Sequence, residues 1–100
     1  MKLRFARRAA QDLADIADYI RTENPKAAVR VRSEILKAIE ALVRFPRLGR
    51  RQSVGGVRKL ITRRYGYLIY YTADEAGGQI VILAIRHPGR TSPDLAGGHD

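Results

Sequence analysis

The pattern of hydrophobic and polar positions first alternates and then takes a helical spacing near the N-terminus. In residues 2–6, Leu3 and Phe5 fall on one side of the chain and Lys2 and Arg4 on the other, which predicts a short strand. In residues 7–23 the apolar positions recur every three or four residues, which predicts an amphipathic helix. Its apolar stripe is made of Ala9, Leu13, Ile16, Ala17 and Ile20, with Tyr19 at the border as a packing residue.

A second helix is predicted directly after the first. Asn24 can cap its N-terminus, and Pro25 suits the first helical position, where the missing N–H group has no partner to lose. Pro46 disfavours helix at the residue before it, so the helix should end near Arg44 or Phe45. Few residues join the two helices, which therefore should form an antiparallel hairpin. The second apolar stripe consists of Ala28, Val31, Ile35, Ala38, Ile39 and Leu42.

Three strand-like runs follow, in residues 57–65, 67–72 and 79–87. Gly66 and the segment 74–78 mark the turns between them, so the three strands should form an antiparallel meander. The last run is continuously apolar from Ile80 to Ile85, which is typical of a central strand that is covered on both faces. The predicted fold is α+β with the order β-α-α-β-β-β, in which a helical hairpin packs on an antiparallel sheet.

The length of 100 residues suits one domain, which we place at residues 1–92, followed by a flexible C-terminal tail at residues 93–100. Residues 46–56 form a basic, glycine-containing loop that lacks the lysine of a phosphate-binding loop. The absence of cysteine permits a reducing setting. No apolar run is long enough to span a bilayer, and no signal-peptide core is present, so we expect a cytoplasmic protein with no membrane association.

The charge of the chain is strongly positive and unevenly distributed. Lysine and arginine number 19 against 10 acidic residues, for a net charge of +9. No acidic residue occurs between Ala41 and Ala73, a span that contains eight cations. Arginine binds phosphate and carboxylate equally well in bidentate geometry, so the excess fits a nucleic acid or an acidic protein partner. A third interpretation of the basic residues is that they form a solvated face with no partner, in a proteome rich in arginine.

Most kinds of catalytic site are disfavoured by the residues present. Two histidines twelve positions apart do not make a metal-ligand set, and we expect neither a metal nor a cofactor. Ribonuclease chemistry remains open, because attack by the 2′-hydroxyl of RNA needs only an acid, a base and cations around the phosphate. His87 is the candidate base or acid, and Arg63, Arg86 and Lys59 are the candidate phosphate-binding cations.

Each of these candidates also has a structural interpretation. A histidine at a strand end before Pro88 is more often hydrogen-bonded within the protein than catalytic. Arg86 ends a buried strand, where an unpaired charge is costly. It should therefore either pair with an acid of its own chain, such as Asp94, or bind a ligand.

Several motifs in order resemble the RelE/ParE superfamily, the toxins of type II toxin–antitoxin operons, also called plasmid-stabilisation proteins. The motifs are DLADIADYI in the first helix, NPKAA at the start of the second, FPRLGR at its end, then GVRKLITRRYGYLIYY and VILAIRHPGR. The likeness spans Lys2 to Arg90. It implies a helical hairpin on an antiparallel sheet, and a cognate antitoxin that assembles with the toxin as a hetero-oligomer.

The superfamily contains two kinds of toxin, and the NP.AA, P.LGR and IRH..R elements of this chain look ParE-like. The resemblance therefore implies inhibition of DNA gyrase without catalytic residues. The alternative is the RelE type, which cleaves mRNA on the ribosome; here nothing aromatic follows Tyr71, where such enzymes have a late tyrosine. A toxin without an active target is the third hypothesis. The predicted surface for antitoxin or target consists of Arg58, Lys59, Arg63, Arg64, Arg86, His87 and Arg90.

Overall fold

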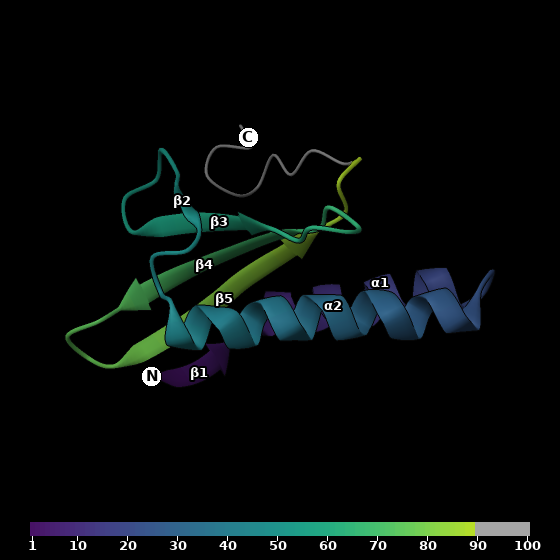
Figure 1. Cartoon of the computed structure of the whole chain (residues 1–100), viewed down its shortest axis with the longest axis horizontal. Coiled ribbons are helices and arrows are strands. Elements are labelled where there is room, and N and C mark those ends of the chain that lie inside the picture. Colours follow the sequence, from purple (N-terminus) through teal and green to yellow (C-terminus); the bar gives the residue numbers. More distant parts are fainter. Residues whose placement is uncertain (90–100) are drawn as a thin grey trace.

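Two helices lie on one face of a five-stranded sheet (Figure 1). The computed structural model describes residues 1–89, and its order of elements confirms the predicted α+β class. One strand was not predicted: residues 50–51, assigned from sequence to a basic loop, form the short strand β2. The elements are β1 (Lys2–Phe5), α1 (Arg7–Arg21), α2 (Pro25–Arg44), β2 (Arg50–Arg51), β3 (Val57–Ile61), β4 (Leu68–Asp74) and β5 (Gln79–Arg86).

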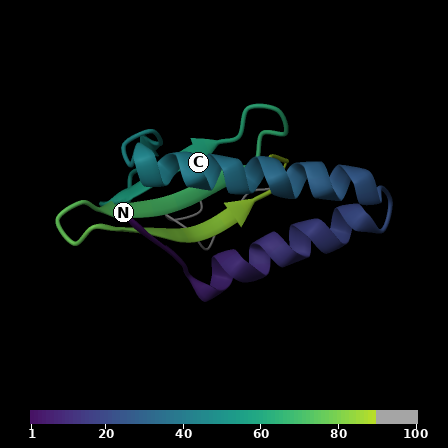
Figure 2. The ribbon, with the colours of Figure 1, turned by 60° about the horizontal axis from the view of Figure 1, so that its bottom comes forward.

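The helices form where the sequence predicts them. The Asn24 side chain caps α2 by accepting a hydrogen bond from the N–H group of Ala27 at 3.1 Å, and Pro25 occupies the first turn. The helix ends at Arg44, before Pro46. Figure 2 shows the two helices side by side as a hairpin. The packing role predicted for Tyr19 is wrong, because this side chain is 60% exposed.

The sheet has the strand order β1-β5-β4-β3-β2 and is mixed, not purely antiparallel as predicted. The meander of β3, β4 and β5 is confirmed as antiparallel, whereas β1 pairs with β5 in parallel, with Leu3 opposite Ile80. A parallel pair needs a long connection, and here the helical hairpin and the meander supply it. Strand β3 ends at Ile61, four residues earlier than predicted, so residues 62–65 belong to a turn.

A β-bulge in β5 affects which face of the sheet the side chains of this strand point to. Tyr70 pairs with Ala84 and Tyr71 with Ile82, which leaves Leu83 as an extra residue. As a result Ile82 and Ile85 both belong to the cluster under the helices, while Leu83 packs on the opposite face. The predicted central position of this strand, between β1 and β4, is confirmed.

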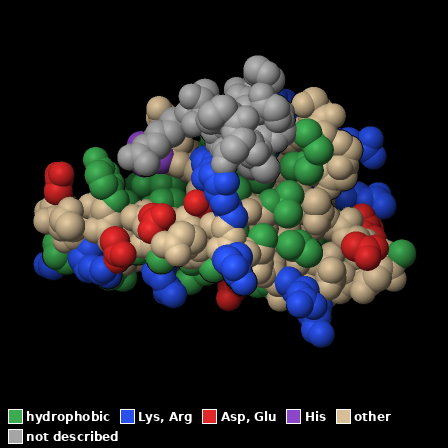
Figure 3. All heavy atoms as spheres, turned by 180° about the vertical axis from the view of Figure 1, so that it is seen from behind, with side chains coloured by type: hydrophobic (Ala, Val, Ile, Leu, Met, Phe, Trp, Pro, Cys, Tyr) green, Lys and Arg blue, Asp and Glu red, His purple; other side chains and the backbone are tan. Residues whose placement is uncertain are grey.

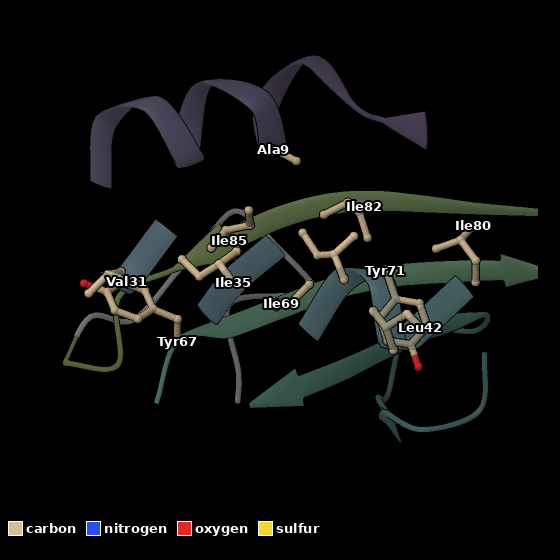
Figure 4. Close-up of a cluster of buried hydrophobic side chains, with 11 residues drawn as sticks. Ala9, Val31, Ile35, Leu42, Tyr67, Ile69, Tyr71, Ile80, Ile82 and Ile85 are labelled. Atoms are coloured by element: carbon tan, nitrogen blue, oxygen red, sulfur yellow. The ribbon is translucent and has the colours of Figure 1, made fainter. Parts of the chain in front are cut away.

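The main hydrophobic core lies between the helices and the sheet (Figure 4). The apolar stripe of α2 contributes Val31, Ile35, Ile39 and Leu42. The sheet contributes four isoleucines and Tyr71, and Tyr67 comes from the connection just before β4. Each such side chain contributes about 1.5–3 kcal/mol when it is fully buried. A smaller cluster of Val57, Tyr70 and Ala84 lies on the other face of the sheet. Among residues 1–89 no helix is both long and apolar enough to cross a bilayer.

Candidate functional site

The turn between β3 and β4 presents two of the candidate cations. The buried Thr62 closes this turn with two hydrogen bonds to Tyr67, both at 2.9 Å. Its backbone N–H donates to the carbonyl of Tyr67, and its hydroxyl accepts from the N–H of Tyr67. Gly66 supplies the positive φ of +73° that the turn needs. Arg63 and Arg64 therefore lie in an exposed turn and not on the strand predicted for them.

Glu34 of α2 ties the same turn to the helical layer. Its two carboxylate oxygens accept hydrogen bonds from the backbone N–H groups of Arg64 at 2.6 Å and Tyr65 at 3.2 Å. The Arg64 guanidinium lies over the Tyr65 ring, 5.6 Å from its centre. The backbone of the turn is thus held by α2, while the arginine side chains remain at the surface.

Arg86 is paired within the protein. Its guanidinium lies 3.3 Å from both carboxylate oxygens of Asp12, and Asp12 also accepts a hydrogen bond from the N–H of Ile85 at 2.9 Å. Both side chains are only 13% exposed. Of the two alternatives left open for Arg86, the structure shows the first, pairing with an acid of its own chain; the acid is Asp12 of α1, whereas Asp94 lies outside the described residues. No signal in the sequence marked Asp12, which is separated from Arg86 by 74 positions.

His87 is held at the end of β5 by two contacts. Its Nδ1 accepts a hydrogen bond from the N–H of Gly89 at 3.0 Å, and its ring meets the Tyr67 ring edge-on at 5.5 Å between centres. These contacts agree with the structural interpretation of His87 and do not place it against a second acid or base.

The structure brings some of the predicted residues together and separates others. Leu68 pairs with Ile61 on one side and Arg86 on the other, so the turn that carries Arg63 and Arg64 lies at the same end of the sheet as Arg86 and His87 (Figure 1). This part of the predicted grouping is present in the fold.

Arg58 and Lys59 do not join that group. They lie further along β3, opposite Tyr71 and Tyr70 of β4, and as neighbours on one strand they point to opposite faces. The Arg58 guanidinium donates to the carbonyl of Gly49 at 2.8 Å, and the Lys59 ammonium lies 6.0 Å from the centre of the Tyr70 ring. Arg90 lies outside the described residues. Seen from behind, basic side chains are spread over the surface and do not form one block (Figure 3).

A groove of about 440 Å³ between α2 and the outer edge of β3 was not predicted from the sequence. Ala38, Ala41 and the acidic Glu34 belong to its helical wall, and the other wall includes Leu60, Thr62 and the exposed side chains of Leu48 (52%) and Ile61 (53%). Lys37 and Arg63 are its basic members. Strand β2 pairs only with Arg58 and Lys59, so the edge of β3 beyond them faces this groove. No sequence signal marked this groove, because Ile61 falls within the run 57–65 that was predicted as one strand.

The loop between α2 and β2 is attached to the sheet by the buried Tyr71. Its hydroxyl accepts a hydrogen bond from the N–H of Gly49 at 2.8 Å and donates to the carbonyl of Pro46 at 2.9 Å. Burial raises the pKa of the Tyr71 hydroxyl above its usual value, although the Gly49 bond and the nearby Arg58 charge act in the opposite direction. A Cβ on Gly49 would stand 2.7 Å from the Tyr71 ring, so a glycine is required here.

Residues 1–89 contain no group of three or more histidine, cysteine, aspartate or glutamate side chains placed to hold a metal ion. At the end of the sheet that carries Arg63, Arg86 and His87, hydrogen bonds and an ion pair join the sheet to the helices. This end of the sheet can present cations to a partner, and the apolar groove beside it can accept side chains.

Residues 3–91 match the family described as "ParE toxin of type II toxin-antitoxin system, parDE". The chain is 30% identical over 94 residues to "Putative toxin Y4kP" of Sinorhizobium fredii, an alignment that covers 94% of this chain and 95% of that protein. In the structure titled "Chromosomal ParDE TA system from P. aeruginosa", one chain superposes with a TM-score of 0.75 at 30% identity, over 87% of this chain and 95% of that one. The E. coli RelBE toxin–antitoxin complex also contains a similar chain, with a TM-score of 0.67, 16% identity, and coverage of 89% and 98%, which is a likeness of fold alone.

Proposed function

Since the chain belongs to the ParE toxin family of type II toxin–antitoxin systems, we propose that it arrests growth by binding and inhibiting DNA gyrase, and that a cognate antitoxin neutralises it. Sequence and fold place it in the RelE/ParE superfamily. Family membership does not by itself establish the target, so inhibition of gyrase is the proposed step.

A binding mechanism is favoured over a catalytic one because two candidate catalytic residues are already held by contacts within the protein. Arg86 is paired with Asp12, and the Nδ1 of His87 accepts a backbone hydrogen bond. An RNA-cleaving site requires a proton acceptor, a proton donor and cations that converge on one phosphate. In this protein two of the corresponding groups, Arg86 and His87, hold β5 to α1 and to the turn after β5, while Arg63 lies in an exposed turn.

The antitoxin is expected to occupy the groove between α2 and β3. An extended antitoxin segment can add to the open edge of β3 and insert apolar side chains between Ala38 and Ile61. Acidic side chains of that segment would meet Lys37 and Arg63 at the rim. The P. aeruginosa ParDE structure is a toxin–antitoxin system, which supports a protein partner of this kind.

The proposal is tested by a gyrase supercoiling assay with purified toxin, with and without its antitoxin. We expect supercoiling to stop at a small molar excess of toxin and to recover when the antitoxin is added first. Ile61→Asp places a charge in the groove and should weaken neutralisation by the antitoxin without changing the inhibition of gyrase. Full supercoiling activity in excess folded toxin would refute the gyrase target.

The second candidate function is cleavage of mRNA on the ribosome, as in RelE-type toxins. One observation favours it: the turn that carries Arg63 lies at the same end of the sheet as Arg86 and His87. This function predicts that Arg63→Gln, which changes an exposed side chain, abolishes toxicity with an unchanged fold. Equal toxicity of the wild type and this variant would argue against it.

A further inference from the structure

A second cleft lies near the opposite end of the sheet from the Arg63 turn. Its volume is about 450 Å³, and it is formed by the loop after α2, the β2–β3 hairpin and the end of β4. Three arginines line it, Arg47, Arg51 and Arg58, together with one acid, Glu75. A cleft of this size can hold a nucleotide-sized ligand.

The pairing of β2 with β3 places like charges directly opposite one another. Arg50 faces Lys59 and Arg51 faces Arg58 across the ladder. Like charges in such positions destabilise a strand pair, so four cations on two short strands reduce the stability of the hairpin. An anion bound at this hairpin would remove that repulsion.

The cations of the cleft are only partly neutralised within the protein. Arg58 donates to the carbonyl oxygens of Gly49 at 2.8 Å and Arg47 at 3.5 Å, which orient its guanidinium but carry no net charge. Arg47 pairs with Glu75 at 2.9 Å, and both side chains are well exposed. Three arginines and one glutamate leave the lining with an excess of two positive charges.

The remaining lining favours a ligand that is recognised by its charge. Gly55 and Gly56 belong to the wall, and a Cβ built on either would meet nothing within 4 Å, so the backbone there is open to a close ligand. Among the described residues, the apolar lining is limited to Val57 and Ala73, and no aromatic ring lines the cleft. Such a surface has little to offer the apolar anchors of a protein segment or a stacked base.

We propose that this cleft binds the phosphodiester backbone of a nucleic acid, without sequence preference, through Arg47, Arg51 and Arg58. Guanidinium groups bind phosphate oxygens in bidentate geometry, and the contacts release counterions from the nucleic acid. The inference goes beyond the proposed function, because it assigns a ligand to a surface that is separate from the groove proposed for the antitoxin.

The test measures fluorescence anisotropy of short labelled nucleic acids of mixed sequence over a series of salt concentrations. Single-stranded RNA, single-stranded DNA and duplex DNA are compared, with a polyglutamate peptide as an acidic protein mimic. The variant R47Q/R51Q removes two cleft charges. The matched control R30Q/R32Q removes two exposed charges from α2, and thermal unfolding verifies that both variants are folded.

For the wild type we expect binding to at least one nucleic acid, and the preferred one identifies DNA or RNA as the source. R47Q/R51Q should weaken that binding at least about ten-fold and lower the salt slope by about 1.4–1.8, since each phosphate contact contributes about 0.7–0.9. R30Q/R32Q should change affinity roughly two-fold or less. Glu75→Gln removes the one acid that residues 1–89 contribute to the cleft lining and should tighten binding roughly two- to five-fold, a gain that misfolding cannot produce.

Three results would overturn the inference. One is a wild type that binds none of the nucleic acids at low salt. The second is an equal loss of affinity in the two double variants, which would indicate an effect of net charge alone. The third is binding of polyglutamate that is lost in R47Q/R51Q while nucleic acid binding is unaffected, which would assign the cleft to an acidic protein. None of these results bears on gyrase inhibition, which the supercoiling assay measures separately.

Discussion

Replacing Asp12 by alanine should be among the most destabilising single changes of a polar residue in the helical layer. The substitution removes the acceptor of the Ile85 N–H and leaves Arg86 without this carboxylate at a site where its side chain is 13% exposed. A hydrogen bond to a charged group contributes about 1.5–3 kcal/mol, and loss of one partner of a buried ion pair costs about 3–5 kcal/mol. The contacts overlap, and the 3.3 Å separation from Arg86 is long, so we expect a total of about 3–4 kcal/mol.

The measurement is urea unfolding followed by circular dichroism, with the midpoint and the slope fitted together. Asp12→Asn keeps an oxygen acceptor but no charge, and it should cost about half as much as Asp12→Ala. Asp15→Ala is the control on the same helix, because Asp15 is exposed and its change should stay within about 0.5 kcal/mol. A loss of less than about 1 kcal/mol for Asp12→Ala would refute the reasoning, since it would mean that Arg86 does not depend on this partner.

Other contacts give predictions of the same kind. Tyr71→Phe leaves the Gly49 N–H and the Pro46 carbonyl without their partner and should lower the free energy of unfolding by about 2–3 kcal/mol in the same assay. Gly49→Ala should destabilise the protein by about 1–3 kcal/mol, seen as a lower Tm, because the added Cβ would overlap the Tyr71 ring. Asn24→Ala removes the cap of α2 and should cost about 1 kcal/mol. Stability should fall as pH rises above the usual tyrosine pKa of 10.0, because the raised pKa of Tyr71 keeps it neutral in the folded state while the unfolded chain ionises, and Tyr71→Phe should make the decline shallower.

The helical half of the fold could be predicted because its signals are local. The Asn24 cap, Pro25 and two apolar stripes lie within the segments that they define. The parallel pairing of β1 with β5 could not be read in this way, since its partners are separated by most of the chain and an alternating pattern carries no direction. The early end of β3 has the same cause: Glu34, 30 positions earlier, holds the turn at Arg64.

The candidate site was predicted only in part. The residue types and the end of the sheet where Arg63, Arg86 and His87 gather follow from strand order and from the motifs. What those side chains contact depends on distant residues, such as Asp12 for Arg86. The α2–β3 groove and the arginine cleft are formed by segments that only the fold brings together, so their lining residues show no common pattern in the sequence.

The most direct test of a toxin that binds its target without cleaving RNA is genome-wide mapping of mRNA 5′ ends soon after the protein is induced without its antitoxin. The account predicts intact messages together with a DNA-damage response, as expected when gyrase is blocked. New 5′ ends in a fixed codon register, lost in the Arg63→Gln variant, would contradict it and would establish a ribosome-dependent nuclease.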